Sequence, residues 1–89
     1  MLREPIIISN TLGLHTRAAA KLVATASKFE SKIEFSRNDQ MADCKSIMSI
    51  ILLGAKKGTQ MDLIITGADE LEARDAILNL IANKFEEAN

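Results

Sequence analysis

The chain has 89 residues, enough for one compact domain and too few for two. With 47% hydrophobic and 26% charged residues, we expect it to bury a core and remain soluble. A formal net charge of -1 and only three aromatic residues argue against nucleic-acid binding, which needs a cationic surface and stacking side chains.

Membrane, disulfide and metal chemistry are not predicted either. No apolar stretch approaches the roughly 18 to 20 residues of a membrane span, and the first residues lack the basic and apolar regions of a signal peptide. Cys44 is the only cysteine, so no internal disulfide can form, and we expect a reducing, cytoplasmic location. One histidine and one cysteine, far apart in sequence, make a structural zinc site improbable, and no cofactor is expected.

The first third of the chain predicts a strand, a loop and a helix. Residues 3–9 contain three consecutive isoleucines, which suit a strand, and Pro5 suggests the start of that strand or a sheet edge. Residues 10–14 predict a loop. From His15 to about Lys28 the apolar residues recur at helical spacing. They are Ala19, Leu22, Val23 and Ala26.

The middle of the chain predicts a hairpin. Ile33 and Phe35 alternate with polar residues in a second strand, a turn follows at residues 38–39, and residues 40–43 form a short third strand. Cys44 reads as a small buried residue at its end. Met41 and Met61 read as core residues.

Ser46 is the predicted N-cap of a short helix, residues 47–53, which Gly54 ends. A helix of two turns cannot bury every apolar residue that it carries. We assign Ile50 and Leu53 to the core. The remaining apolar residues, Ile47, Met48 and Ile51, are predicted to form an exposed docking patch.

The last third predicts a strand and a helix. Residues 60–65 alternate as a fourth strand, and Asp69 with Glu72 resembles a capping box at the start of the final helix. The predicted order is β-α-β-β-α-β-α, an α+β fold in a single domain, residues 1–89. Each helix has one apolar stripe to bury, so most helices should cover one face of an antiparallel sheet.

His15 lies where the loop that contains Gly13 meets the first helix. A helix start presents backbone N–H groups without partners and a partial positive charge, which together suit an anion. Arg17 adds a planar donor for phosphate oxygens. The same partial charge favours the neutral imidazole, which is nucleophilic toward phosphorus. A lone histidine at a helix start is, however, more often a capping or surface residue.

Two segments resemble one family. Leu12-Gly13-Leu14-His15-Thr16-Arg17-Ala18-Ala19 resembles the active-site signature of the HPr family, the histidine phosphocarriers of the bacterial phosphotransferase system. About thirty residues later, Lys45-Ser46-Ile47-Met48-Ser49-Ile50 resembles the regulatory serine region of that family. Chain length and element order agree from end to end.

The resemblance implies an open-faced β-sandwich with a four-stranded antiparallel sheet in the order 1-4-2-3 and three helices on one face. It also implies that enzyme I, charged by phosphoenolpyruvate, phosphorylates Nδ1 of His15, and that the group then passes to a IIA-type acceptor domain. Arg17 would bind the phosphoryl group, helped by the backbone N–H groups of Thr16 and Arg17, and Ala18 is also assigned to the phosphate-binding site. The family often has a smaller residue at position 16 and a proline at position 18.

The resemblance further implies phosphorylation of Ser46 by an HPr kinase/phosphorylase in organisms that have one. The leading hypothesis is a monomeric carrier that is consumed and regenerated stoichiometrically, rather than an enzyme. Its branch, sugar-transporting or nitrogen-related, stays open. The alternative is a regulatory binding module that acts through Ser46, with His15 incidental.

Overall fold

A computed structural model describes residues 1–87 of the chain. Its sheet has the order β1-β4-β2-β3, and every neighbouring pair is antiparallel. The strands are β1 (Leu2–Ile7), β2 (Lys32–Arg37), β3 (Gln40–Asp43) and β4 (Gln60–Thr66). The helices are α1 (Thr16–Ala26), α2 (Ile47–Leu53) and α3 (Glu70–Ala82), followed by a short 3₁₀ helix, η1 (Lys84–Glu86). The predicted element order and strand order are both confirmed.

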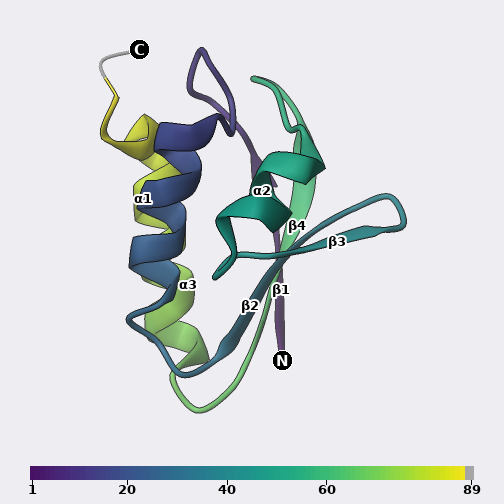
Figure 1. The fold of residues 1–89 in the computed structure, drawn as a ribbon. Coiled ribbons are helices and arrows are strands. Elements are labelled where there is room, and N and C mark those ends of the chain that lie inside the picture. Colours follow the sequence, from purple (N-terminus) through teal and green to yellow (C-terminus); the bar gives the residue numbers. More distant parts are fainter. Residues whose placement is uncertain (88–89) are drawn as a thin grey trace.

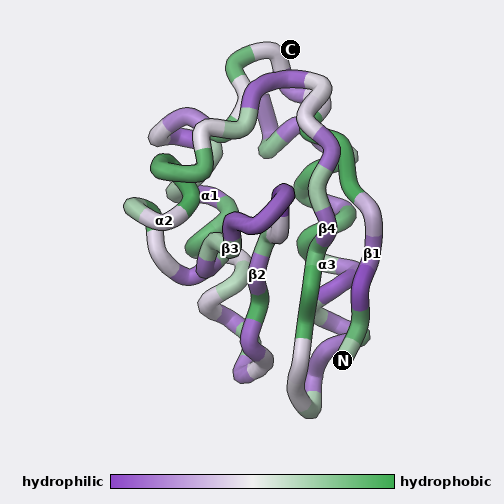
Figure 2. The backbone as a smooth tube through the Cα atoms, turned by 90° about the vertical axis from the view of Figure 1, so that its right-hand side faces the viewer, coloured by the Kyte–Doolittle hydropathy of each residue, from purple (hydrophilic) through white to green (hydrophobic). Residues whose placement is uncertain are grey.

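The helices lie against one face of the sheet, with α1 and α3 side by side (Figure 1). Strand β1 is an edge strand, which is one of the two interpretations that Pro5 allowed, since a proline cannot donate a ladder hydrogen bond. Opposite Pro5 on β4 stands Asp62. Figure 2 shows hydrophobic residues along much of β4, which lies between β1 and β2, whereas the turn between β2 and β3 is hydrophilic.

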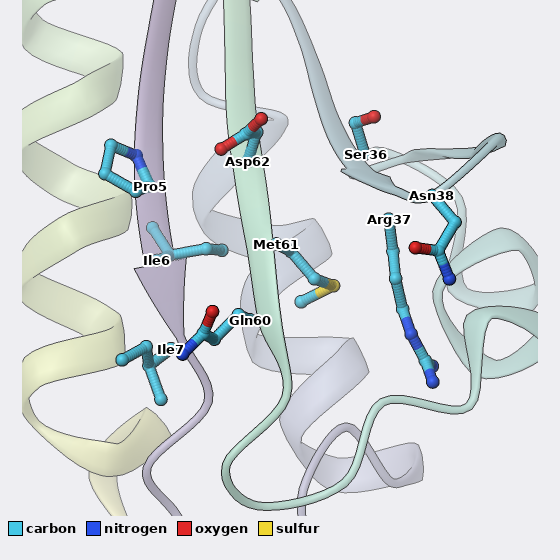
Figure 3. Close-up of a pocket in the computed structure, with 9 residues that line it drawn as sticks. All are labelled: Pro5, Ile6, Ile7, Ser36, Arg37, Asn38, Gln60, Met61 and Asp62. Carbon is cyan, nitrogen blue, oxygen red and sulfur yellow. The ribbon is translucent and has the colours of Figure 1, made fainter.

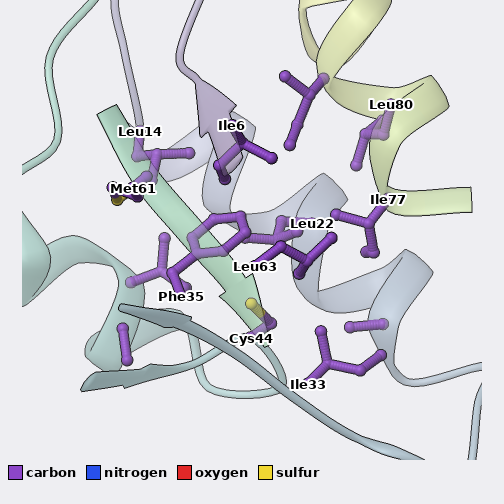
Figure 4. Packing of buried hydrophobic residues seen from close by; sticks show 14 of the residues in the cluster. Ile6, Leu14, Leu22, Ile33, Phe35, Cys44, Met61, Leu63, Ile77 and Leu80 are labelled. Carbon is purple, nitrogen blue, oxygen red and sulfur yellow. The ribbon is translucent and has the colours of Figure 1, made fainter. Parts of the chain in front are cut away.

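The core lies between the sheet and the helices. Phe35 and Leu63 of the sheet point toward Leu22 of α1 and Ile77 of α3 (Figure 4), and all four side chains are buried. Period-two alternation on the strands and 3.6-residue spacing on the helices turn these side chains to a common interior. Cys44 is buried in the same cluster, as predicted.

Two details of the predicted elements are wrong. Met41 is 51% exposed, because on β3 the buried position falls to its neighbour Ala42. Asp69 makes no capping hydrogen bond to α3. Its carboxylate instead accepts hydrogen bonds from the backbone N–H groups of Glu30 (2.9 Å) and Ser31 (3.0 Å) and from the Ser31 hydroxyl. Met61 is buried as predicted.

After α3 the backbone leaves the right-handed helical conformation. Lys84, Phe85 and Glu86 all have positive φ, between 54° and 64°, a conformation that L-residues rarely adopt. Phe85 is fully buried and fixes this turn in the core. The end of the described chain lies beside the start of α1 (Figure 1).

No helix within residues 1–87 is both long enough and apolar enough to cross a membrane.

Candidate functional site

The loop before α1 holds His15 through a tight turn at Gly13. Gly13 has φ +67°, and its carbonyl accepts hydrogen bonds from the His15 N–H (3.0 Å) and from the Asn10 side-chain amide (2.8 Å). The next residue, Leu14, donates its N–H to the carbonyl of Ala55 at 2.9 Å. The loop is thus tied to the segment after α2, and His15 enters α1 from a fixed backbone.

His15 is the N-cap of α1. Its backbone is extended (φ -81°, ψ 180°), and its carbonyl accepts the first helical hydrogen bond, from Ala19 at 2.8 Å. Its ring atom Nδ1 accepts a hydrogen bond from the Arg17 backbone N–H at 3.3 Å. Nδ1 therefore carries a lone pair in this arrangement and faces the first turn of the helix.

The other ring nitrogen of His15 meets a carboxylate that sequence reasoning missed. Nε2 contacts Oε2 of Glu87, and Oε1 of Glu87 accepts a hydrogen bond from Asn10 Nδ2 at 2.9 Å. The Glu87 side chain is only 11% exposed. The pKa of Glu87 is lowered, first by the hydrogen bond from Asn10 and then by the contact with His15. Glu87 lies 72 positions from His15, so no local pattern could have paired them.

Thr16, Arg17 and Ala18 form the first turn of α1. Thr16 and Arg17 are exposed, whereas the methyl group of Ala18 is fully buried, so only the backbone of Ala18 is placed to meet a ligand. Within residues 1–87 no carboxylate pairs with Arg17, although other basic residues do form ion pairs. An exposed guanidinium thus stands two residues from the imidazole, beside first-turn N–H groups that have no intrahelical partner.

Ser46 is the N-cap of α2, as predicted. Its hydroxyl oxygen accepts a hydrogen bond from the Ser49 N–H at 3.3 Å, and the Ser49 hydroxyl accepts one from the Asp43 N–H at 3.0 Å. Gly54 ends the helix in the left-handed conformation. The side chain of Ser46 thus has a structural role as the cap of α2.

The predicted docking residues lie on the surface of α2. Ile47 is 40% exposed, Met48 66% and Ile51 37%, whereas Ile50 and Leu53 are buried, as predicted. The sequence analysis left out Leu52, which is 71% exposed. We call Ile47, Met48, Ile51 and Leu52 the α2 patch.

A hollow of about 410 Å³ lies elsewhere, across β1, β2 and β4, with Pro5, Arg37 and Asp62 among its lining residues (Figure 3). None of the predicted site residues borders it. Residues 1–87 contain no group of three or more His, Cys, Asp or Glu side chains placed to hold a metal ion. Burial raises the pKa of the Cys44 thiol, so this residue is a poor nucleophile.

Comparison with known proteins identifies the family. The sequence model of the PTS HPr component phosphorylation site matches residues 2–83. The chain belongs to the HPr family. The phosphocarrier protein HPr of Cupriavidus necator is 48% identical over 87 residues, which cover 98% of each chain. A crystal structure of HPr from Thermoanaerobacter tengcongensis superposes over the full length of both chains, with a TM-score of 0.95 and 43% identity.

A second HPr structure from Thermoanaerobacter tengcongensis bears on the oligomeric state. It is described as a dimer, with a TM-score of 0.75 and 42% identity, over 98% of this chain and all of the other. The prediction of a monomer is therefore not confirmed.

Proposed function

We propose that this chain is a phosphocarrier of the phosphotransferase system that accepts a phosphoryl group on His15 from enzyme I and transfers it to a IIA-type domain. The observation that carries the proposal is the position of His15, with Nδ1 turned toward the first turn of α1 and Arg17 exposed beside it. Membership of the HPr family supports it. The protein acts in the cytoplasm as a single domain and is regenerated stoichiometrically, so it is not an enzyme in the strict sense.

The proposed reaction needs only groups that surround His15. The lone pair on Nδ1 attacks phosphorus, the bond between phosphorus and the donor breaks, and an Nδ1–P bond forms. The Arg17 N–H, released from Nδ1, can then donate to a phosphoryl oxygen, as can the Arg17 guanidinium. Transfer to the acceptor runs the same steps in reverse.

Incubation with enzyme I and labelled phosphoenolpyruvate tests this proposal. Wild type should take up an acid-labile label, and His15→Ala should take up none. Arg17→Lys keeps the charge but loses the planar fork, so we expect it to accept label roughly tenfold more slowly or worse, given about 1.5–3 kcal/mol for a charged hydrogen bond. Unlabelled wild-type protein would refute the carrier function.

We also propose that Ser46 is a regulatory phosphorylation site. Its hydroxyl lies at the start of α2, next to the α2 patch, so a phosphate there would add about 1.5 to 2 negative charges to that surface. We expect Ser46→Asp to slow phosphorylation of His15 several-fold while the fold is retained. The matched control is Gln60→Glu, which adds one charge on β4. Equal rates in all three proteins would contradict a regulatory role.

The alternative function is a regulatory binding module that acts through Ser46 without phosphoryl transfer. The labelling experiment separates the two, because the module needs no label on His15. Pairing labelled wild type with a sugar-type and a nitrogen-type IIA domain then identifies the branch of the system.

A further inference from the structure

Four groups form a closed network around the His15 ring. Glu87 contacts Nε2 of His15 through one carboxylate oxygen, and the other oxygen accepts a hydrogen bond from Asn10. The amide of Asn10 also donates to the carbonyl of Gly13, which in turn accepts the His15 N–H. The network thus joins the loop before α1 to the end of the described chain.

Both contacts of the His15 ring indicate the same tautomer. Nδ1 accepts a hydrogen bond from the Arg17 N–H, so it carries no proton. Nε2 faces a carboxylate, which can only accept, so Nε2 carries the proton. The lowered pKa of Glu87 keeps that carboxylate ionised at neutral pH.

The orientation of Asn10 reinforces this arrangement. Asn10 is fully buried, and its amide nitrogen donates to two acceptors, the Gly13 carbonyl at 2.8 Å and the Glu87 carboxylate at 2.9 Å. Within residues 1–87 no donor reaches its Oδ1. The amide group therefore directs a donor, not an acceptor, at Glu87.

A strained backbone turn precedes Glu87. Three consecutive residues with positive φ are costly, and the burial of Phe85 holds them in place. Glu86, within the turn, also lies 3.6 Å from the Lys21 amine of α1. The chain thus adopts an unfavourable backbone that brings Glu87 to the His15 ring.

We propose that Glu87, held by Asn10, is a positioning residue that keeps the proton on Nε2 of His15 and so leaves the Nδ1 lone pair available for phosphorus. This inference rests on the proposed function. When the Nδ1–P bond forms, the Nε2 proton stays in place, the ring becomes a cation, and the Glu87 carboxylate balances its charge. When the Nδ1–P bond breaks toward the acceptor, a neutral imidazole with its Nε2 proton leaves.

Two substitutions at position 87 separate this role from simple packing. In Glu87→Gln, Asn10 still donates to the side-chain oxygen, so the new NH₂ group faces Nε2 and favours the proton on Nδ1. Glu87→Ala removes the acceptor but presents no donor. We therefore expect Glu87→Gln to accept phosphoryl groups from enzyme I about tenfold more slowly than wild type, or worse, as with other wrong-tautomer histidines. Glu87→Ala should accept phosphoryl groups faster than Glu87→Gln.

The ring tautomer is measured directly from the imidazole ¹⁵N shifts of the unphosphorylated protein. We expect wild type to be protonated on Nε2 and Glu87→Gln to shift toward protonation on Nδ1. Glu86→Gln is the matched control, because it makes the same chemical change one residue away without facing the ring. It should resemble wild type in both measurements.

The inference is overturned if wild type is protonated mainly on Nδ1, or if Glu87→Ala is as slow as Glu87→Gln. The tautomer measurement needs no phosphoryl donor, so it decides the inference even if wild type takes up no label and the carrier function fails. If Glu87→Gln does not fold, the wild-type tautomer together with the rate of Glu87→Ala still decides: a rate of Glu87→Ala tenfold or more below wild type then counts against the inference.

Discussion

Gly13 packs against the segment after α2. A Cβ atom built at Gly13 would lie 2.5 Å from the Ala55 carbonyl oxygen and 2.9 Å from the Lys56 Cα. Both are backbone atoms, so no side chain can move aside to make room. At the residue scale, the path of the backbone into His15 therefore depends on the absence of a side chain at this position.

Gly13→Ala should be markedly less stable than Gly54→Ala in urea unfolding. The two glycines have nearly the same φ, +67° and +65°, but a Cβ at Gly54 meets nothing within 4 Å. Gly54→Ala should be less stable by only the cost of placing an alanine in the left-handed conformation, about 1–2 kcal/mol. Gly13→Ala should lose about 1–3 kcal/mol more of its stability, because the added methyl group overpacks the site. Equal losses would show that the close approach to Ala55 carries no cost.

At the element scale, Asp69 joins the start of α3 to the segment before β2. Its carboxylate accepts three hydrogen bonds from Glu30 and Ser31, rather than capping α3. The hydrogen bond from the Ser31 hydroxyl is the main cause of the lowered pKa of Asp69, and the bond from the Glu30 N–H adds to it. The capping-box prediction failed because tertiary donors outcompeted the helix's own N–H groups.

We expect Asp69→Asn to lower the urea midpoint of unfolding at pH 7 and to lose this effect in acid. A folded-state pKa below the ordinary value of about 3.9 means that the ionised carboxylate stabilises the fold above that value. That contribution is lost as the pH falls through the lowered folded-state pKa. Urea titrations at pH 7 and in a series from pH 4 downward measure the change.

Asp75→Asn is the control for this series, because within residues 1–87 Asp75 pairs only with the neighbouring Arg74 on the surface of α3. Its midpoint should differ little from that of wild type at either pH. If Asp69→Asn stays less stable than wild type by the same amount in acid, the stabilising hydrogen bonds of Asp69 do not depend on ionisation of its carboxyl group.

At the scale of the whole molecule, the sheet and helices gather His15, Asn10 and Glu87 at one end of α1 and leave the α2 patch uncovered within residues 1–87. The patch follows Ser46 directly along the chain. Its exposed isoleucines, leucine and methionine are typical of a surface that binds partner proteins, and methionine adapts to more than one partner. The docking role remains a prediction.

Met48→Ser tests the α2 patch. Because Met48 is 66% exposed, we expect its replacement to change stability by no more than about 0.5 kcal/mol. If Met48 anchors enzyme I, the KM for the reaction should rise by about fivefold or more. Leu71→Ser is the matched control, since Leu71 is an exposed apolar residue on α3, outside the patch. The same KM in both variants would remove Met48 from the docking surface.

The sequence by itself determined the element order, the N-cap at Ser46 and the placing of His15 and Arg17 at a helix start. These features depend on local periodicity, caps and turn residues, which the chain carries within a few positions. Only the tertiary structure decided that Asp69 binds Ser31 and that Glu87 meets His15. Those pairs lie 38 and 72 positions apart, and the second depends on a turn of three consecutive positive-φ residues that no propensity predicts. The proposed nucleophile, His15, is therefore recognised from its local sequence. The contact that we propose to hold its Nε2 proton comes from Glu87, far along the chain.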